Sequence, residues 1–256
     1  MLIRPATTSD LPELHRIWWA TQLATDLKAK TEPNPWFAHV LRTGRMLVAV
    51  IDGEPVGFAG RRELGGTTVV TDFFVHPASQ GRRVGSRLLA DLLTAGQPVM
   101  TLASDDPRAQ AAYARCGMRS RWECHYLSTD APVAPSDDLK IETAAAHPLA
   151  DADVRHLRDD FDCAFLSIGG GGWAAISEHS LETCRVSPAG DPTMLVLGAL
   201  GEVRPTTENR IDLQLSDRHP AFAALIDLGF RVDFSDTLMA SAGAVEPDPT
   251  RFSFNG

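Results

Sequence analysis

The stretch of the sequence with the clearest chemical character is "VHPASQGRRVGSRLL", residues 75–89, where an apolar run ends at a proline and a helical pattern follows. The start of an α-helix presents unpaired N–H groups and a partial positive charge. Gly81 and Gly85 let backbone and ligand approach closely, and Arg82 and Arg83 add positive charge. This turn predicts a site for a pyrophosphate. The alternative is an ordinary strand-to-helix turn with solvated arginines, because short glycine motifs often occur without a ligand.

Two better-known phosphate motifs do not fit this stretch. No Gly-Lys-Ser/Thr follows the glycines, which excludes a Walker loop. The spacing is not the GxGxxG of dinucleotide-binding proteins, and no acidic residue ends a second strand at the required distance.

The turn resembles the acyl-CoA-binding motif of the GNAT N-acetyltransferase superfamily, which is Gln/Arg-x-x-Gly-x-Gly/Ala after a strand ending in Val-x-Pro. Gln80 and Gly85 fit the ends of that pattern, and Gly81 matches a glycine common there. The middle glycine of the pattern is replaced by Arg83, which is a departure.

A second stretch, "DPRAQAAYARCGM", is similar to a later helix of the same superfamily, Asn-x-x-Ala-x-x-x-Tyr-x-x-x-Gly-Phe. Ala109, Tyr113 and Gly117 match, while Asp106 replaces the usual Asn and Met118 the usual Phe. The two motifs stand in the expected order. The resemblance implies an α/β (α+β mixed sheet) protein with the GNAT acyl-CoA N-acyltransferase fold, and acetyl-CoA as co-substrate.

The resemblance also implies where the acyl donor binds. In the superfamily the strand before the turn carries a bulge and splays away from the next strand, and pantetheine lies in the split against strand backbone. The matching backbone here is that of Phe73, Phe74 and Val75. The predicted pyrophosphate contacts are Gln80, Gly81, Arg82, Arg83, Val84, Gly85 and Ser86. Asp106 and Ala109 complete the predicted cofactor-binding set.

Acyl transfer to an amine needs groups that move protons. A primary amine is mostly protonated at neutral pH, so a base or a water chain takes its proton before attack. The departing thiolate benefits from an acid, and Tyr113 stands where the superfamily usually places that acid. The alternative role for Tyr113 is a core aromatic on a helix.

Asp72 is the first candidate for the base, directly or through water, because it lies on the strand that leads into the split. Regular alternation would put Thr71 on the opposite face from Asp72. His76 has a suitable intrinsic pKa, with a solvent-facing position beside Pro77 as its alternative. Glu63 on the preceding strand is a third candidate and a predicted acceptor contact.

Acceptor recognition in such folds comes mostly from the first two helices and their loop. Trp18 and Trp36 are the predicted acceptor contacts there, with Trp19 and Phe37 nearby. An aromatic cluster could line a pocket or stack on an amine cation. The alternative is packing of the helices on the sheet.

The elements that position these residues follow from the periodicity of the chain. Strands are predicted at residues 2–7, 67–75 and 98–104, and a hairpin is predicted to turn at Asp52-Gly53. Helices are predicted after Ser9, before Gly44, after Gly81 and around Tyr113. The order over residues 1–130 is β-α-α-β-β-β-α-β-α-β.

The chain predicts two GNAT-like units in tandem: residues 1–130 as the catalytic domain, 131–138 as a linker, and 139–256 as a degenerate copy. Ser104–Arg119 and Ser216–Arg231 share seven of 16 residues without gaps. In the second unit Leu225 replaces Tyr113, and no Val-x-Pro-x-x-Arg-Gly-x-Gly pattern appears. "GGGGW", residues 169–173, is interpreted as a flexible turn without clear flanking strands, or alternatively as a ligand loop.

Composition limits the remaining possibilities. The 256 residues carry a net charge of −9, which argues against a protein that binds nucleic acid. The four cysteines have no metal-ligand spacing, and no metal is expected. We expect a cytoplasmic protein with no membrane partner, because no signal peptide or membrane span is seen.

The protein is expected to act on a small-molecule amine, as a monomer (a pseudo-dimer of tandem domains) or a homodimer. The alternatives are a non-catalytic acyl-CoA-binding module, or an O-acyl or longer-chain acyltransferase.

Overall fold

The computed structural model describes residues 1–22, 34–134, 141–143, 150–168, 171–204, 210–250 and 252–253. Part of the predicted linker, residues 135–138, lies outside them. The chain forms two compact units. Unit 1 comprises Met1–Ser120 and Met239–Glu246, and unit 2 comprises Arg121–Leu238 and Pro247–Gly256. The domain boundaries expected from sequence stay a prediction.

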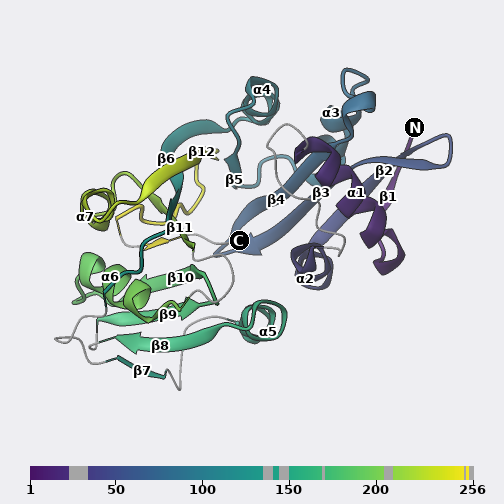
Figure 1. Cartoon of the computed structure of the whole chain (residues 1–256). Coiled ribbons are helices and arrows are strands. Elements are labelled where there is room, and N and C mark those ends of the chain that lie inside the picture. Colours follow the sequence, from purple (N-terminus) through teal and green to yellow (C-terminus); the bar gives the residue numbers. More distant parts are fainter. Residues whose placement is uncertain are drawn as a thin grey trace. The chain divides into compact units, whose positions relative to one another are not determined.

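Unit 1 is built on five neighbouring strands (Figure 1). In spatial order they are β1 (Leu2–Pro5), β2 (Arg45–Ile51), β3 (Glu54–Leu64), β4 (Thr67–Val75) and β5 (Val99–Ala103). β1 to β4 pair antiparallel, whereas β4 and β5 run parallel. The β2–β3 turn at Asp52-Gly53 has positive φ at both residues, which is the hairpin geometry expected from that dipeptide.

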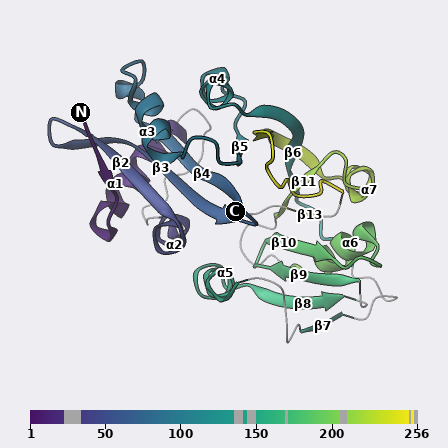
Figure 2. The same ribbon diagram turned by 180° about the vertical axis from the view of Figure 1, so that it is seen from behind.

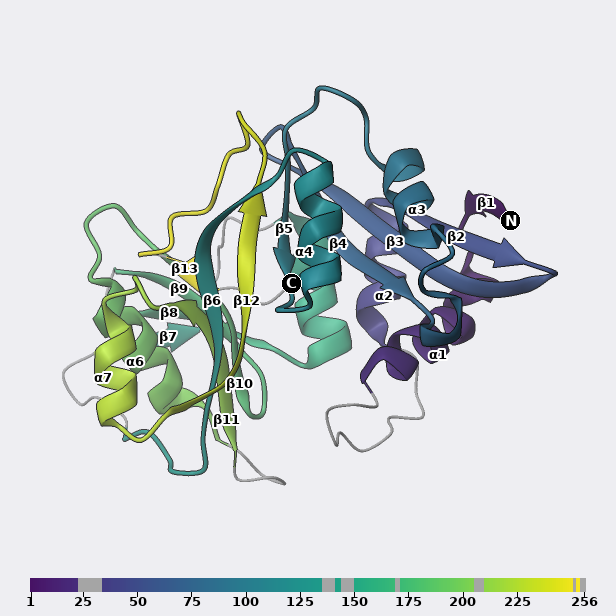
Figure 3. The same ribbon diagram turned by 90° about the horizontal axis from the view of Figure 1, so that it is seen from above.

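Helices cover both faces of this sheet (Figure 3). They are α1 (Leu11–Gln22), α2 (Pro35–Thr43), α3 (Val84–Leu92) and α4 (Pro107–Arg115). One core holds Leu14 and Ile17 of α1 with Phe37 of α2, and the other holds Leu88 of α3 with Tyr113 of α4. The predicted element order over residues 1–130 is confirmed, from β1 through β6 (Arg119–Thr129).

The end of the chain also contributes to unit 1. Ser241 donates its N–H to the Val99 carbonyl oxygen (2.8 Å), and its Oγ accepts from the Val99 N–H (2.9 Å). Val245 donates its N–H to Thr67 Oγ1 (2.8 Å), and Met239 is 3% exposed in the core with α3 and α4. Segment 239–246 therefore supports β5 and the start of β4.

Unit 2 repeats the mixed architecture, and Figure 2 shows four of its strands, β7 to β10, in succession. Its spatial order is β12–β6–β11–β13–β10–β9–β8–β7. The elements not yet bounded are β7 (Ile141–Thr143), α5 (Asp151–Arg155), β8 (Ala164–Ile168), β9 (Gly172–Ile176), β10 (Ser180–Val186), α6 (Pro192–Glu202), β11 (Ile211–Ser216), α7 (Ala221–Asp227), β12 (Arg231–Ala240) and β13 (Phe252–Ser253). A π-helical turn, His156–Asp160, follows α5.

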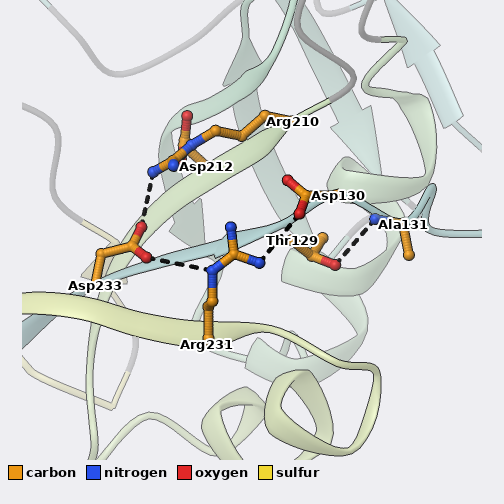
Figure 4. Close-up of polar contacts among 7 residues, drawn as sticks. All are labelled: Thr129, Asp130, Ala131, Arg210, Asp212, Arg231 and Asp233. Carbon is orange, nitrogen blue, oxygen red and sulfur yellow. Dashed lines mark hydrogen bonds and ion pairs between the residues drawn. The ribbon is translucent and has the colours of Figure 1, made fainter. Parts of the chain in front are cut away.

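The core of unit 2 lies between its sheet and helices α6 and α7. An ion-pair network joins the ends of three strands of unit 2, β6, β11 and β12 (Figure 4). Arg210 contacts Asp212 and Asp233, each at 2.7 Å, and Arg231 contacts Asp130 at 3.2 Å and Asp233 at 3.6 Å. Exposed pairs of this kind each stabilise a fold by about 0–1 kcal/mol, so the network mainly fixes strand ends.

The interpretation of "GGGGW" as a run without flanking strands was wrong. β8 ends at Ile168 and β9 begins at Gly172, so the glycines join two antiparallel strands. Gly169 and Gly170 themselves lie outside the described residues. The apolar run before the glycines is short and only weakly alternating, so periodicity alone could not identify β8 as a strand.

Candidate functional site

A β-bulge in β4 shapes the centre of unit 1. Gly60 of β3 pairs with Asp72 and Arg61 pairs with Val70, so Thr71 is an extra residue without a partner in the register. Thr71 and Asp72 therefore point to the same face, and the predicted alternation at this place was wrong. A Cβ added to Gly60 would lie 2.9 Å from Thr71 Oγ1 and 3.0 Å from Asp72 Oδ2.

β4 and β5 separate beyond the bulge. Within these two fully described strands, Thr68–Val70 pair with Val99–Thr101, and β4 then continues to Val75 without β5 as a partner. The expected bulge and the expected split are thus both present. The split leaves one edge of β4 open.

Hydrogen bonds at the end of β4 show which backbone groups face the split. His76 donates its N–H to Val56 of β3, and Val75 accepts on its carbonyl from Gln80 Nε2, at 2.9 and 3.2 Å. Because successive residues of a strand direct their backbone groups to opposite sides, Val75 and Phe73 face away from β3, whereas Phe74 faces it. Of the three predicted pantetheine contacts, Phe73 and Val75 have the required direction.

The turn after β4 uses two residues with left-handed backbone. Gly81 has φ +75°, and Arg83 has φ +63° and ψ +15° at the N-cap of α3. The left-handed conformation favours glycine, which explains why the superfamily pattern has glycine where this chain has Arg83. The side chains of Arg82, Arg83 and Ser86 are exposed beside this turn.

The N-terminus of α3 is open to an anion. In the described part of the chain no side chain caps it. The N–H groups of its first turn belong to Val84, Gly85 and Ser86, and the Val84 side chain is core, 1% exposed. A Cβ on Gly85 would lie 2.8 Å from the Phe73 ring, so the close packing of Phe73 favours glycine at this position.

A polar chain links the turn to α4. Arg108 donates from Nη1 to Gln80 Oε1 (2.8 Å), and its guanidinium also pairs with Asp106 (2.8 Å). Asp106 caps α4 by accepting the Arg108 N–H, and Arg108 lowers the pKa of Asp106. Ala109 is half-buried against the core of α3 and α4. Asp106 thus serves the helix cap and the turn.

Asp72 is a buried carboxyl group, 5% exposed. Its Oδ2 accepts from Thr71 Oγ1 at 2.8 Å, and the Trp36 side chain also donates a hydrogen bond to it. Burial raises the pKa of Asp72 to about 6, against the opposing effect of the two hydrogen bonds. A carboxyl group with this pKa is mostly ionised at neutral pH and can still accept a proton, as a general base must.

The helix pair α1–α2 places Trp36 against Asp72. Asn34 caps α2 by accepting the Trp36 N–H at 3.0 Å, and the Asn34 N–H donates to His15 Nδ1 of α1 at 3.2 Å. Trp18 packs edge-on to Phe37, which is 1% exposed. Of the predicted aromatic cluster, Trp36 therefore reaches the site, and Phe37 belongs to the core.

Tyr113 lies on the opposite face of the sheet from Asp72. It is 5% exposed among α3 and α4 residues, and its ring centroid lies 5.6 Å from that of Phe73, whose backbone faces the split. Tyr113 is therefore a core aromatic and also borders the split, so the two roles expected for it are compatible.

The two other base candidates are engaged elsewhere. His76 accepts the Ala78 N–H on Nδ1 (3.3 Å) and caps the short 3-10 turn Pro77–Ser79. Glu63, with its side chain 55% exposed, accepts from Thr68 Oγ1 and lies near the far end of β3, three register pairs from Gly60. At about 3.3 Å per residue this places Glu63 roughly 10 Å along the sheet from Asp72.

Three contributors to the site were missed by sequence reasoning. Thr71 joins Asp72 only because of the bulge, Gly60 provides the space for both, and Arg108 holds Gln80. The available signal for Gly60 was its type: a glycine on β3 leaves room for the polar side chains of Thr71 and Asp72 on the next strand. Nothing in the local sequence marks the bulge itself.

Unit 2 repeats the framework of this site. In β10 the register skips Glu182 just as β4 skips Thr71, and the residues before the bulge, Ser180 and Leu181, pair parallel with β11. Leu225 stands at the place of Tyr113 and is fully buried. The bulge and the parallel pair are thus kept, whereas the tyrosine is replaced by a leucine.

The turn after β10 is closed by the chain itself. Asp191 accepts the N–H groups of Thr193 and Met194 at the start of α6, at 2.8 and 3.2 Å. The Ser187 N–H donates to Gly171, whose backbone lies so close that a Cβ on Gly190 would overlap it. A carboxylate and a neighbouring loop therefore occupy the place that the arginine-rich turn leaves open in unit 1.

The described residues contain neither a membrane-spanning helix nor a group of metal ligands. No helix among them is long and apolar enough to cross a membrane. No three His, Cys, Asp or Glu side chains among them are grouped to hold a metal ion.

Comparison with known proteins shows which family and which solved structures the chain resembles. Residues 11–118 match the family described as "Acetyltransferase (GNAT) family", whose members bind acetyl-CoA. No curated protein sequence matches the chain significantly.

Solved structures resemble the chain over its length. A putative acetyltransferase from Pyrococcus horikoshii has a TM-score of 0.76 at 12% identity, covering 100% of this chain and 94% of that one. A GCN5-related N-acetyltransferase from Sphaerobacter thermophilus has 0.62 at 15%, covering 94% and 95%. A tandem GNAT protein from the clavulanic acid biosynthesis pathway has 0.59 at 17%, covering 96% and 99%. At these identities the likeness is one of fold. Residues 11–118 therefore belong to the GNAT acetyltransferase family, in a chain with the fold of a tandem GNAT protein.

Proposed function

We propose that unit 1 is an acetyl-CoA-dependent N-acetyltransferase that acts on a primary amine of a small molecule. The observation that carries the proposal is the open edge of β4, which leads directly into an uncapped, arginine-bearing N-terminus of α3. An extended amide-containing arm fits a free strand edge, and a pyrophosphate fits a helix N-terminus.

The donor lies along this path in the proposed complex. Backbone groups of Phe73 and Val75 bind the pantetheine arm, and the amides of Val84, Gly85 and Ser86 bind the pyrophosphate. Arg82 and Arg83 add charge beside it. In the structure Gln80 Nε2 donates a hydrogen bond to the Val75 carbonyl oxygen, and the pantetheine arm displaces this hydrogen bond in the proposed complex.

Asp72 is the proposed proton acceptor. The ammonium group of the acceptor, with a pKa near 10, gives one proton to the Asp72 carboxylate, directly or through water. The free amine then attacks the thioester carbonyl, forming a C–N bond and breaking the C–S bond. The second proton of the nitrogen leaves through water to restore the acid that protonates the thiolate. The pKa of Asp72 near 6 keeps it ionised for this task at neutral pH.

Tyr113 is the proposed proton donor to the departing thiolate. A phenol is neutral at pH 7 and transfers its proton to a sulfur whose conjugate thiol has a pKa of about 8.5. Because Asp72 and Tyr113 lie on opposite faces of β4, the amine approaches from the α1–α2 side and the thiolate leaves towards α4.

Turnover with acetyl-CoA and a panel of primary amines, followed as free thiol, tests this function. We expect amine-dependent thiol release that Tyr113→Phe lowers by about 10²-fold or more in kcat, with little change in the KM for acetyl-CoA. Acetyl-CoA binding without thiol release, alike in both proteins, would support the non-catalytic module instead. Release only with alcohols or with longer acyl-CoA would support the O-acyl or longer-chain alternatives.

A further inference from the structure

We infer that Trp36 is a positioning residue whose indole N–H orients the Asp72 carboxylate and stabilises its ionised form. The inference rests on the proposed function, in which Asp72 accepts the proton of the acceptor amine. It assigns Trp36 a role different from the acceptor contact expected from sequence.

The contacts around Asp72 support this role. The carboxyl group is 5% exposed, so water does little to stabilise its charge, and buried charge is costly without hydrogen bonds. Thr71 Oγ1 and the Trp36 side chain each donate one hydrogen bond to it. The indole N–H is a donor only, so it favours the ionised carboxylate. A carboxylate has room for about four hydrogen bonds, which leaves space for an ammonium or a water.

Trp36 is itself fixed by the first two helices. Its N–H is bound by the Asn34 side chain, and Asn34 is tied through its own N–H to His15 of α1. Its ring also lies 5.5 Å from that of His39. The α1–α2 pair is the part of such folds that contacts the acceptor, so a movement there would reach Asp72 through Trp36.

Other charged groups near this face do not replace Trp36. The titratable or charged side chains on the elements against β4 are His15, Glu13 and Arg16 of α1, His39 and Arg42 of α2, and Arg61 and Glu63 of β3. Burial raises the pKa of Asp72, and the hydrogen bonds from Thr71 and Trp36 oppose that rise.

The first experiment compares pH profiles of kcat/KM for the amine. Trp36→Phe keeps an aromatic ring but removes the donor, and we expect the acidic limb of its profile to move up by about one pH unit. Thr71→Val should move the limb in the same direction. Trp19→Phe is the matched control, because it removes an indole from α1 and should leave the limb in place. An unchanged limb in Trp36→Phe would overturn the inference, whether or not Thr71→Val moves the limb.

The second experiment does not depend on activity. The chain has five tryptophans, whose indole N–H signals can be followed by NMR of 15N-labelled protein. The Trp36 signal should move with a midpoint near the Asp72 pKa, and the movement should vanish in Asp72→Asn. A Trp36 signal insensitive to Asp72→Asn would overturn the inference even if Trp36→Phe does not fold. A titrating signal in a protein without acetyl transfer would instead refute only the proposed function.

Discussion

Arg83 is the residue at which this chain departs from the superfamily pattern while keeping its geometry. The residue adopts the left-handed backbone that glycine usually supplies, at a cost of about 1–2 kcal/mol for a residue with a side chain. Its guanidinium lies exposed at the uncapped start of α3. The observed left-handed conformation gives a physical reason for the glycine of the pattern.

Charge reversal and glycine replacement at Arg83 should therefore differ. Arg83→Glu places a carboxylate beside the proposed pyrophosphate, and we expect the KM for acetyl-CoA to rise about tenfold or more. Arg83→Gly removes charge but relieves the backbone, and its KM should stay within about threefold of the parent. Steady-state kinetics with varied acetyl-CoA measures both. If neither variant changed the KM for acetyl-CoA, the turn would not hold the phosphate.

The raised pKa of Asp72 predicts how the stability of the fold depends on pH. The folded-state pKa of about 6 is higher than the unfolded value, so the native state disfavours ionisation. The stability contributed by Asp72 is fully present below about pH 4 and is lost as pH rises through about 6. The loss amounts to about 3 kcal/mol well above pH 6.

Asp72→Asn should therefore be more stable than the parent at pH 8, by up to about 3 kcal/mol, and similar to it at pH 4. Urea unfolding at the two pH values measures the difference. Asp91→Asn, at an exposed position on α3, is the control and should change little. A stability gain for Asp72→Asn that is the same at both pH values would contradict a raised pKa.

Among the elements of residues 1–130, helices and strands were predictable from periodicity, but the bulge in β4 was not. Asp72 was identified from its place on the strand, whereas its partnership with Thr71 depends on one extra residue in the register. Periodicity gives side-chain faces only for a regular strand. The contact of Trp36 with Asp72 could not be predicted either, because it joins residues far apart in the chain.

The two units differ at their strand–turn–helix elements, β4 to α3 in unit 1 and β10 to α6 in unit 2. Val186-Ser187-Pro188-Ala189 partly repeats Val75-His76-Pro77-Ala78, a signal that was overlooked because the arginines and the later glycines are missing. The start of α6 is then capped by Asp191, whereas that of α3 is not. A capping carboxylate repels an anion and uses the N–H groups that would bind it. We propose that only unit 1 binds acetyl-CoA.

The link between Gln80 and α4 gives an element-scale prediction. Arg108→Met removes the contacts to Gln80 and Asp106 while keeping most of the side-chain length. Because both contacts are exposed, we expect a modest rise in the KM for acetyl-CoA, about two- to fivefold, with kcat unchanged. Arg115→Met, at the other end of α4, is the control. A fall in kcat for Arg108→Met alone would place this arginine in the chemistry rather than in the turn.

At the scale of the whole molecule, unit 1 is assembled from both ends of the chain. Segment 239–246 supports β5 through Ser241 and β4 through Val245. The first domain predicted from sequence, residues 1–130, stays a prediction, and segment 239–246 lies outside it. Linker-like residues mark boundaries along the chain and carry no information on a segment that packs from much later in the sequence.

A protein shortened to residues 1–130 should therefore be less stable than the full chain. It loses the Met239 side chain from the core and three hydrogen bonds to β4 and β5. We expect the Tm to fall by more than about 10 °C. Thermal unfolding followed by circular dichroism measures this. An equal Tm would show that residues 1–130 are a self-sufficient domain.

The most direct test of the central claim, that the turn after β4 holds the acyl donor, is a calorimetric titration with acetyl-CoA. We predict one acetyl-CoA per chain, with binding weakened about tenfold or more by Arg83→Glu. Arg45→Glu, a charge reversal at the exposed start of β2, two strands from β4, should leave the affinity unchanged. Two binding sites per chain, or one site indifferent to Arg83→Glu, would contradict the account.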